Sequence, residues 1–273
     1  MFKPEFYLFS QECNVAKGAL LGGLTAFSNV DLDQPGSLYS AFFQTSIGLE
    51  RLMKVTVVID HKIKHDLASP TNEQLKRIGH DLLALYDKCA TLAVEQSLDS
   101  AQWFGIETVE HDTLAFLSGF AKRSRYYNLD AISGGRTATD PLSQWARLHQ
   151  RIAETYISYK FREKLNQKAF DFADRIGAHG WERWIDGRYV TNVDAIYLHS
   201  LFKKANPYCV WTILRLLKPF YKLLDVLSDQ AHKIEVEKGI NEPTVPYITE
   251  FFPFFLASLD SVRRRRNWTK IYS

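Results

Sequence analysis

The feature that most constrains the fold of this chain is a run of apolar residues whose spacing alternates between three and four. The run consists of Leu75, Ile78, Leu82, Leu85, Cys89 and Leu92. Residues at these spacings lie on one face of an α-helix. Thr71 and Gln74 have the spacing of a capping box and mark where the helix begins. The pattern predicts one unbroken amphipathic helix whose apolar face is buried.

A second apolar stripe precedes this one and has a similar length. It contains Leu38, Phe42, Leu49, Leu52 and Met53. Glu50 and Lys54 are four residues apart on a more polar face, where they can pair. A polar connection of about ten residues joins the two stripes, as in helical hairpins. The two segments predict an antiparallel helical hairpin at the centre of an all-α bundle of roughly eight helices.

Proline residues indicate further element boundaries. Asp140-Pro141 predicts the start of a long helix that runs to about Arg175. Asn206-Pro207 predicts the start of another helix, and Pro219 predicts that this helix is kinked or split.

Two short segments have a different pattern. Residues 2–10 alternate weakly, which predicts a short edge strand. Asp186-Gly187 lies between apolar and aromatic residues and favours a small β-hairpin near residues 181–190, with an ordered loop as the alternative. A boundary near residues 134–140 divides the chain into residues 1–135 and 136–273, either as separate units or as one compact unit.

Composition predicts a globular chain without a metal or cofactor. Aromatic residues make up 14% of the sequence, which argues against extensive disorder. The formal charge of +3 is too small to require nucleic acid as a partner. The three cysteines, Cys13, Cys89 and Cys209, lie far apart and form no metal-binding or redox pair.

Two absences predict a cytoplasmic protein. The first residues, MFKPEFYLFSQE, lack a sustained apolar segment and a cleavage site, so we expect no signal peptide. No window reaches the roughly 18 apolar residues that a membrane span requires, so we expect no membrane partner.

His80 is a candidate catalytic residue, because the unperturbed pKa of histidine lies near neutrality and suits proton transfer. The alternative is a partly buried histidine whose ring nitrogen bonds a neighbour within a polar network. Gly79 beside it would permit a close contact between helices. Glu50, Lys54 and Asp81, on polar parts of the same hairpin, are candidate ligand-binding residues.

A third predicted helix begins near Asp112 and leads into a chemically mixed patch. The patch contains Arg125, Tyr126, Tyr127 and Asn128. In one interpretation it binds a ligand: Arg125 holds a phosphate or carboxylate and a tyrosine stacks on a base. In the other, the tyrosines are half-buried anchors and Arg125 pairs with Asp130 or an acidic helix.

The last predicted helix ends in four consecutive arginines, Arg263, Arg264, Arg265 and Arg266. Such a run can bind phosphates. It can equally be a solvated helix end, where cations oppose the helix dipole.

Three segments carry a resemblance to a known family. GLERLMK (48–54), LKRIGHDLLALYDKC (75–89) and AKRSRYYNLD (121–130) resemble segments of HEPN-domain proteins, within a match over residues 36–135. Prokaryotic HEPN proteins are often linked to defence systems and toxins, and the resemblance implies a helical bundle and a dimer. HEPN nucleases carry an arginine and a histidine at a short fixed spacing. None of the eight histidines here has an arginine at that spacing, so the resemblance does not extend to nuclease activity.

These observations predict a binding or interaction protein of bacterial type, with a protein partner or a second copy of itself. One alternative is a metal-independent RNase in which His80 takes the proton of the 2′-hydroxyl and Arg125 holds the charge that develops on phosphate. A second alternative is a small-ligand-binding protein whose pocket is lined by Tyr126, Tyr127 and the paired tryptophans Trp181 and Trp184. RNA is a candidate partner in the first alternative.

Overall fold

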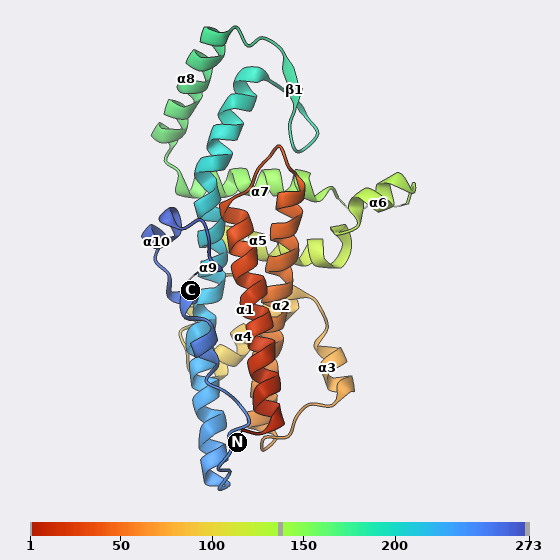
Figure 1. Cartoon of the computed structure of the whole chain (residues 1–273), viewed down its shortest axis with the longest axis vertical. Helices are drawn as coiled ribbons and strands as arrows, with labels where there is room; N and C mark the ends of the chain where they lie inside the picture. The colour runs from red at the N-terminus through yellow and green to blue at the C-terminus, as the bar shows by residue number, and fades with distance from the viewer. Residues whose placement is uncertain (1, 136–138, 271–273) are drawn as a thin grey trace.

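The structure is a computed structural model that describes residues 2–135 and 139–270. It shows an all-α bundle with one small β-hairpin, which confirms the predicted fold class. Three long helices, α1 (Pro4–Ser28), α2 (Gly36–Lys64) and α9 (Asn192–Glu237), run side by side through the molecule (Figure 1). None of the helices in the described part of the chain is both long and apolar enough to cross a membrane.

Shorter elements complete the bundle. The remaining α-helices are α3 (Asn72–Ile78), α4 (Leu82–Glu95), α5 (Val109–Gly119), α6 (Tyr127–Ile132), α7 (Pro141–Tyr156), α8 (Tyr159–Ile176) and α10 (Leu259–Arg264). Single turns are η1 (Ser100–Gln102), the π-helical η2 (Phe120–Ser124), η3 (Ile248–Phe251) and η4 (Pro253–Leu256). The strands β1 (Trp181–Arg183) and β2 (Tyr189–Thr191) pair antiparallel around Asp186-Gly187, as predicted.

The predicted second helix of the central hairpin is interrupted, so the prediction of one unbroken helix is wrong. Gly79 adopts a φ of +74° and ends α3, and Asp81 then caps α4. Leu82 and the later residues of the predicted stripe, Leu85, Cys89 and Leu92, are buried, and α4 packs against α2. Leu75 on α3 is 39% exposed. A Cβ added at Gly79 would meet nothing within 4 Å, so this glycine serves the turn and not a close helix contact.

The N-terminal segment is helical, so the predicted edge strand over residues 2–10 is wrong. Pro4 occupies the first turn of α1, where its missing N–H costs nothing. All of the buried residues of α1 lie between Cys13 and Ser28, and none lies in its first turns. The local alternation near the N-terminus is therefore overridden by packing of the whole helix against α2.

Asp140 caps α7 as predicted and accepts hydrogen bonds from the backbone N–H groups of Leu142 and Ser143. The helix ends at Tyr156, however, and not near Arg175. Ile157 leaves the helical conformation, and α8 begins two residues later. The third helix begins after Thr108, and Asp112 lies within its first turn.

Two prolines lie inside α9, so the helix start predicted at Asn206-Pro207 is wrong. Each proline removes one helical hydrogen bond, at a cost of about 3 kcal/mol. Burial of the apolar side chains that α9 presents to α2, α5 and α7 offsets that cost. Local propensity is outweighed here by tertiary packing.

One hydrophobic core contains side chains from both halves of the chain, including Phe42, Leu85, Trp145 and Phe220. A polar contact also joins α5, α7 and α9. Glu110 is buried, accepts a 2.8 Å hydrogen bond from Tyr156 and lies 3.0 Å from a guanidinium nitrogen of Arg215. This contact fixes the orientation of α7, which forms one wall of the pocket described below.

Candidate functional site

His80, Glu50 and Lys54 come together at the break between α3 and α4. Nδ1 of His80 lies 2.8 Å from Oε1 of Glu50 and 3.2 Å from Nζ of Lys54. Lys54 also donates a 2.8 Å hydrogen bond to the same Glu50 oxygen. Partial burial raises the pKa of Glu50, but the hydrogen bonds from Lys54 and His80 outweigh it and leave the pKa below its ordinary value. His80 is 79% exposed and is not the partly buried residue of the structural interpretation.

Asp81 points to a different set of partners. Its Oδ1 accepts hydrogen bonds from the backbone N–H of Leu83 and the hydroxyl of Ser118, and its carboxylate forms an ion pair with Lys122. The hydrogen bond from Lys122 lowers the pKa of Asp81. Asp81 therefore caps α4 and ties it to the α5–η2 segment.

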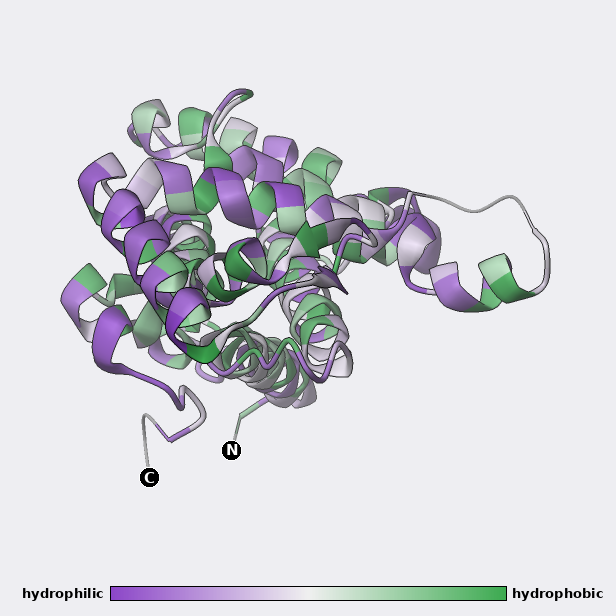
Figure 2. Cartoon of the chain, turned by 90° about the horizontal axis from the view of Figure 1, so that it is seen from above, coloured by the Kyte–Doolittle hydropathy of each residue, from purple (hydrophilic) through white to green (hydrophobic). Residues whose placement is uncertain are grey.

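The mixed patch at residues 125–128 has contacts of its own. The Arg125 guanidinium packs 5.0 Å from the centre of the Tyr126 ring. Tyr127 and Asn128 begin α6, which has no buried residue and projects from the bundle (Figures 1 and 2). Within residues 2–135 and 139–270, no hydrogen bond or ion pair joins His80 to any residue of this patch.

Each residue of the arginine run has an intramolecular contact. Arg263 contacts the hydroxyl and ring of Tyr208, and Arg264 donates to the backbone carbonyl of Asp260. The Arg265 guanidinium lies over the ring of Trp268, and Arg266 donates to the carbonyl of Ser28. The run therefore anchors the C-terminal segment to α9 and α1.

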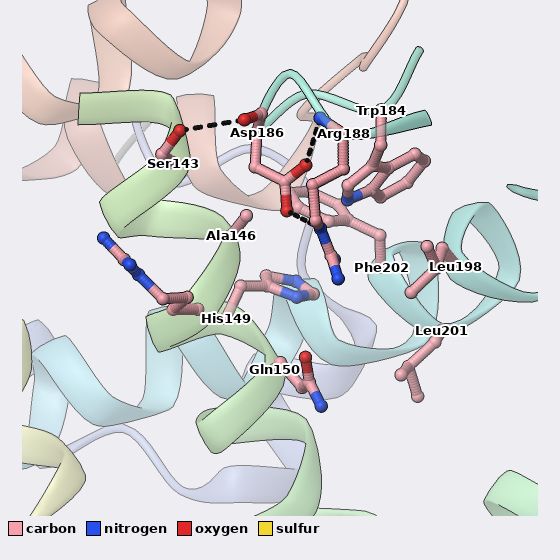
Figure 3. Close-up of a pocket in the computed structure, with 11 residues that line it drawn as sticks. Ser143, Ala146, His149, Gln150, Trp184, Asp186, Arg188, Leu198, Leu201 and Phe202 are labelled. Carbon is pink, nitrogen blue, oxygen red and sulfur yellow. Dashed lines mark hydrogen bonds and ion pairs between the residues drawn. The ribbon is translucent and has the colours of Figure 1, made fainter. Parts of the chain in front are cut away.

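A further polar site is a pocket of which sequence reasoning had named only Trp184. It has a volume of about 290 Å³ and lies between α7, the β1–β2 hairpin and α9 (Figure 3). Its walls are formed by Ser143, Ala146, Arg147, His149, Gln150, Trp184, Asp186, Arg188, Leu198, Leu201 and Phe202. We call it the His149 pocket.

His149 is the central side chain of this pocket. It is only 4% exposed, and its ring stacks on Phe202 at a centroid distance of 3.7 Å. Burial lowers the pKa of His149 to about 3, although Asn206 and the backbone of Phe202 oppose the shift. The imidazole is therefore neutral at neutral pH. Its Nε2 atom has no hydrogen-bond partner in the described structure.

The hairpin closes one side of the pocket through a defined set of hydrogen bonds. The Asp186 carbonyl accepts from the hydroxyl of Ser143 on α7. The Asp186 carboxylate accepts from the backbone N–H and from Nε of Arg188, which leaves the outer guanidinium nitrogens of Arg188 exposed. Arg147 has no hydrogen bond or ion pair to any residue that the structure describes.

The two paired tryptophans have different surroundings. Trp184 is 6% exposed and forms part of the pocket wall, whereas Trp181 is 70% exposed. The sequence signal that could have located the pocket is the combination of the Asp186-Gly187 turn with a histidine on the apolar face of α7. Neither feature specifies the pocket alone, because α9 supplies its third wall.

No family model matches the chain, and comparisons with curated proteins and with solved structures found no match either. The described residues contain no group of three or more histidine, cysteine or acidic side chains that could hold a metal ion. The fold and the His149 pocket therefore define the protein only as an all-α bundle with a polar pocket.

Proposed function

We propose that this chain is a binding protein whose His149 pocket takes a small molecule that combines a flat apolar ring with an anionic group. The observation that carries the proposal is the unpaired Nε2 atom of His149. Leaving a buried polar atom without a partner costs about 1–3 kcal/mol. Nε2 is shielded from solvent in the unliganded structure, so a ligand that shifts the ring or the pocket wall enough to hydrogen-bond to this atom removes that cost.

The shape of the pocket supports a flat ligand. Trp184 and Phe202 supply aromatic walls, and Leu198 and Leu201 supply apolar surface. A volume of about 290 Å³ is near the lower end of the range for small-molecule sites and suits a ligand with one or two rings.

The charges support an anionic substituent. Arg147 and Arg188 both line the pocket. Asp186, the one carboxylate in the pocket wall, already accepts two hydrogen bonds from Arg188. The exposed nitrogens of Arg188 match the geometry of a carboxylate or phosphate.

This proposal keeps the binding class expected from the sequence. The proposal also includes a likeness to HEPN proteins and association with a protein partner.

Support for association comes from exposed apolar residues on α8, which are Tyr159, Phe161, Phe170, Phe172 and Ile176. If they mediate self-association, replacing Phe170 and Phe172 with serine should increase the monomer fraction in sedimentation. A wild-type protein that is monomeric at every concentration would contradict it.

The ligand proposal is tested by thermal melting with matched pairs of compounds. Benzoate, phenyl phosphate and indole-3-carboxylate serve as anionic probes, and benzamide, phenol and indole as their uncharged counterparts. We expect at least one anionic probe to raise the melting temperature of the wild type in a saturable manner, and its counterpart to do so less. A panel without any saturable shift would count against the proposal.

Two variants assign the effect to the pocket. His149→Leu should abolish the ligand-induced shift while leaving the unliganded protein as stable as the wild type or more so, because an unpaired polar group is removed. Arg188→Gln should weaken the response to anionic probes only. Arg175→Gln, on the exposed end of α8, is the control and should respond like the wild type. A His149→Leu protein that is strongly destabilised would instead indicate a purely structural histidine.

A further inference from the structure

A second pocket lies at the connection between α2 and α3 and has a different chemistry. It has a volume of about 230 Å³ and is formed by the last turns of α2, the α2–α3 connection, α3 and one residue of α4. Its charged and titratable lining residues are Asp60, His61, Lys64, His65, Arg77 and Lys88. We call it the basic pocket.

The cations of the basic pocket outnumber its carboxylates. Asp60 is its single acidic residue, and it lies 3.0 Å from Nζ of Lys64. Lys64 also donates to Glu95, outside the pocket. Arg77 and Lys88 have no hydrogen bond or ion pair with any residue in the described ranges. Two cations from different helices therefore line the same pocket without an ion pair to its one carboxylate, Asp60, which pairs with Lys64.

Two histidines line the same pocket, and the pKa of His61 is affected by the positive charges around it. His61 and His65 are one turn apart on α2, and their rings stack at a centroid distance of 3.9 Å. Burial lowers the pKa of His61, the neighbouring His65 and Lys88 lower it further, and only Asp60 opposes them. A positive charge at His61 is thus disfavoured until an anion is present.

Two backbone carbonyls at the end of α2, beside the pocket, are occupied by hydrogen bonds within the chain. The last carbonyls of α2 would present negative dipoles, but those of His61 and Lys62 accept hydrogen bonds. The His61 carbonyl is bonded by the backbone N–H of His65 and lies 2.8 Å from Nδ1 of that residue. The Lys62 carbonyl accepts from the backbone of Leu67.

We propose that the basic pocket binds the phosphate group of a small phosphorylated molecule, held by Arg77 and Lys88 and flanked by His61 and His65. A guanidinium can bond two phosphate oxygens at once, and an ammonium adds a point charge. The residues involved do not overlap with those of the His149 pocket, so either site can fail without the other.

The test uses inorganic phosphate, with chloride at equal ionic strength as the reference. The C2–H signals of the histidines are followed by NMR and assigned with His61→Gln and His65→Gln. We expect saturable shifts of the His61 and His65 signals and an upward shift of the pKa of His61, because a bound anion stabilises the imidazolium. Binding should therefore tighten as the pH falls. Unchanged histidine signals and pKa in phosphate would overturn the proposal.

Variants with the same change in charge distinguish phosphate binding at this pocket from non-specific electrostatic attraction. Arg77→Gln combined with Lys88→Gln should weaken phosphate binding about tenfold or more, since two charge-assisted contacts are lost. Lys76→Gln removes the same charge from the neighbouring position on α3, outside the pocket, and should bind like the wild type. An equal loss in Lys76→Gln would show only non-specific attraction and would overturn the proposal.

Two further experiments identify the kind of molecule that carries the phosphate group. Glycerol phosphate should compete with inorganic phosphate at the same histidine signals. A single-stranded RNA oligonucleotide that binds through Arg77 while inorganic phosphate has no effect would overturn the small-molecule assignment in favour of nucleic acid. His149→Leu should leave the phosphate response unchanged.

Discussion

Gly48 of α2 lies directly against Leu20 of α1: a Cβ added at Gly48 would be 2.9 Å from the backbone nitrogen of Leu20. A second contact of this kind occurs nearby, where a Cβ at Gly23 would be 2.9 Å from the backbone nitrogen of Thr45. The two helices thus pack with their backbones in near contact at two points. Such an approach is possible only where a residue has no side chain.

Gly48→Ala should therefore destabilise the protein by about 1–3 kcal/mol, because the added methyl group meets backbone that cannot move independently. The control is Gly18→Ala on α1, where a Cβ would meet nothing within 4 Å. That substitution should stabilise the helix by up to about 1 kcal/mol. Urea melts of both variants measure the difference, and equal effects at the two positions would refute the close packing.

Leu82→Ala should cost about 2–5 kcal/mol through lost burial and a cavity, since Leu82 is fully buried. Leu75→Ala removes the same atoms from α3, where the side chain is partly exposed, and should cost less than about 1 kcal/mol. The comparison in two-state urea melts checks where the core ends. Similar losses in both variants would mean that α3 packs as tightly as α4.

The ion pair between Asp81 and Lys122 predicts a pH dependence. Because the pKa of Asp81 is lowered in the folded protein, the pair stabilises the fold above the unfolded-state pKa of about 4, and this stabilisation disappears as the pH falls through the folded-state pKa. Asp81→Asn retains a capping side chain but has no charge. Its deficit relative to the wild type should be largest at neutral pH and shrink in acid.

The control for this prediction removes the other partner. In a Lys122→Gln background, Asp81→Asn should have a smaller effect on the free energy of unfolding, and less of that effect should depend on pH. Urea melts over a series of pH values provide the measurement. If Lys122→Gln leaves the pH dependence as it is in the wild type, then Lys122 is not its cause.

The sequence predicted those features that depend on local pattern. Apolar spacing located α2 and α4, and the capping residues Thr71 and Asp140 located two helix starts. Local pattern gave wrong predictions where packing between distant segments determines the structure. Burial along α9 outweighs the tendency of Pro207 to start a new helix, and packing against α2 keeps the N-terminal segment helical. It also predicted that Glu50 and His80 lie in the two halves of one hairpin, and the two side chains do meet, although His80 lies in the break between α3 and α4 and not on a helix.

Apart from Trp184, which the sequence analysis named as a pocket residue, the residues of the His149 pocket were beyond the reach of the sequence for a physical reason. His149 carries no motif, and on α7 it resembles any histidine on an apolar face. Its special property is a buried, unpaired Nε2, which exists only once Trp184 of the hairpin and Phe202 of α9 close around it. A site assembled from three separate elements leaves no fixed spacing to recognise.

The last prediction concerns His80, for which the binding proposal and the RNase alternative predict different experimental results. His80 is largely exposed and contacts Glu50 and Lys54, which also pair with each other. An exposed pair of this kind contributes about 1 kcal/mol or less, so His80→Ala and His80→Gln should both melt close to the wild type. The binding proposal further expects no cleavage of RNA by the purified wild type in the presence of a chelator.

Cleavage chemistry would need a cation for the charge on phosphate. Lys54 lies 3.2 Å from His80, whereas no hydrogen bond or ion pair joins His80 to Arg125 within the described residues. Lys54→Gln and Arg125→Gln are therefore assayed beside the two His80 variants. Wild-type cleavage with chelator present, abolished in both His80 variants without loss of folding, would establish a nuclease. Loss in Lys54→Gln but not in Arg125→Gln would then assign the phosphate-binding cation to α2, and the reverse result would assign it to the segment before α6.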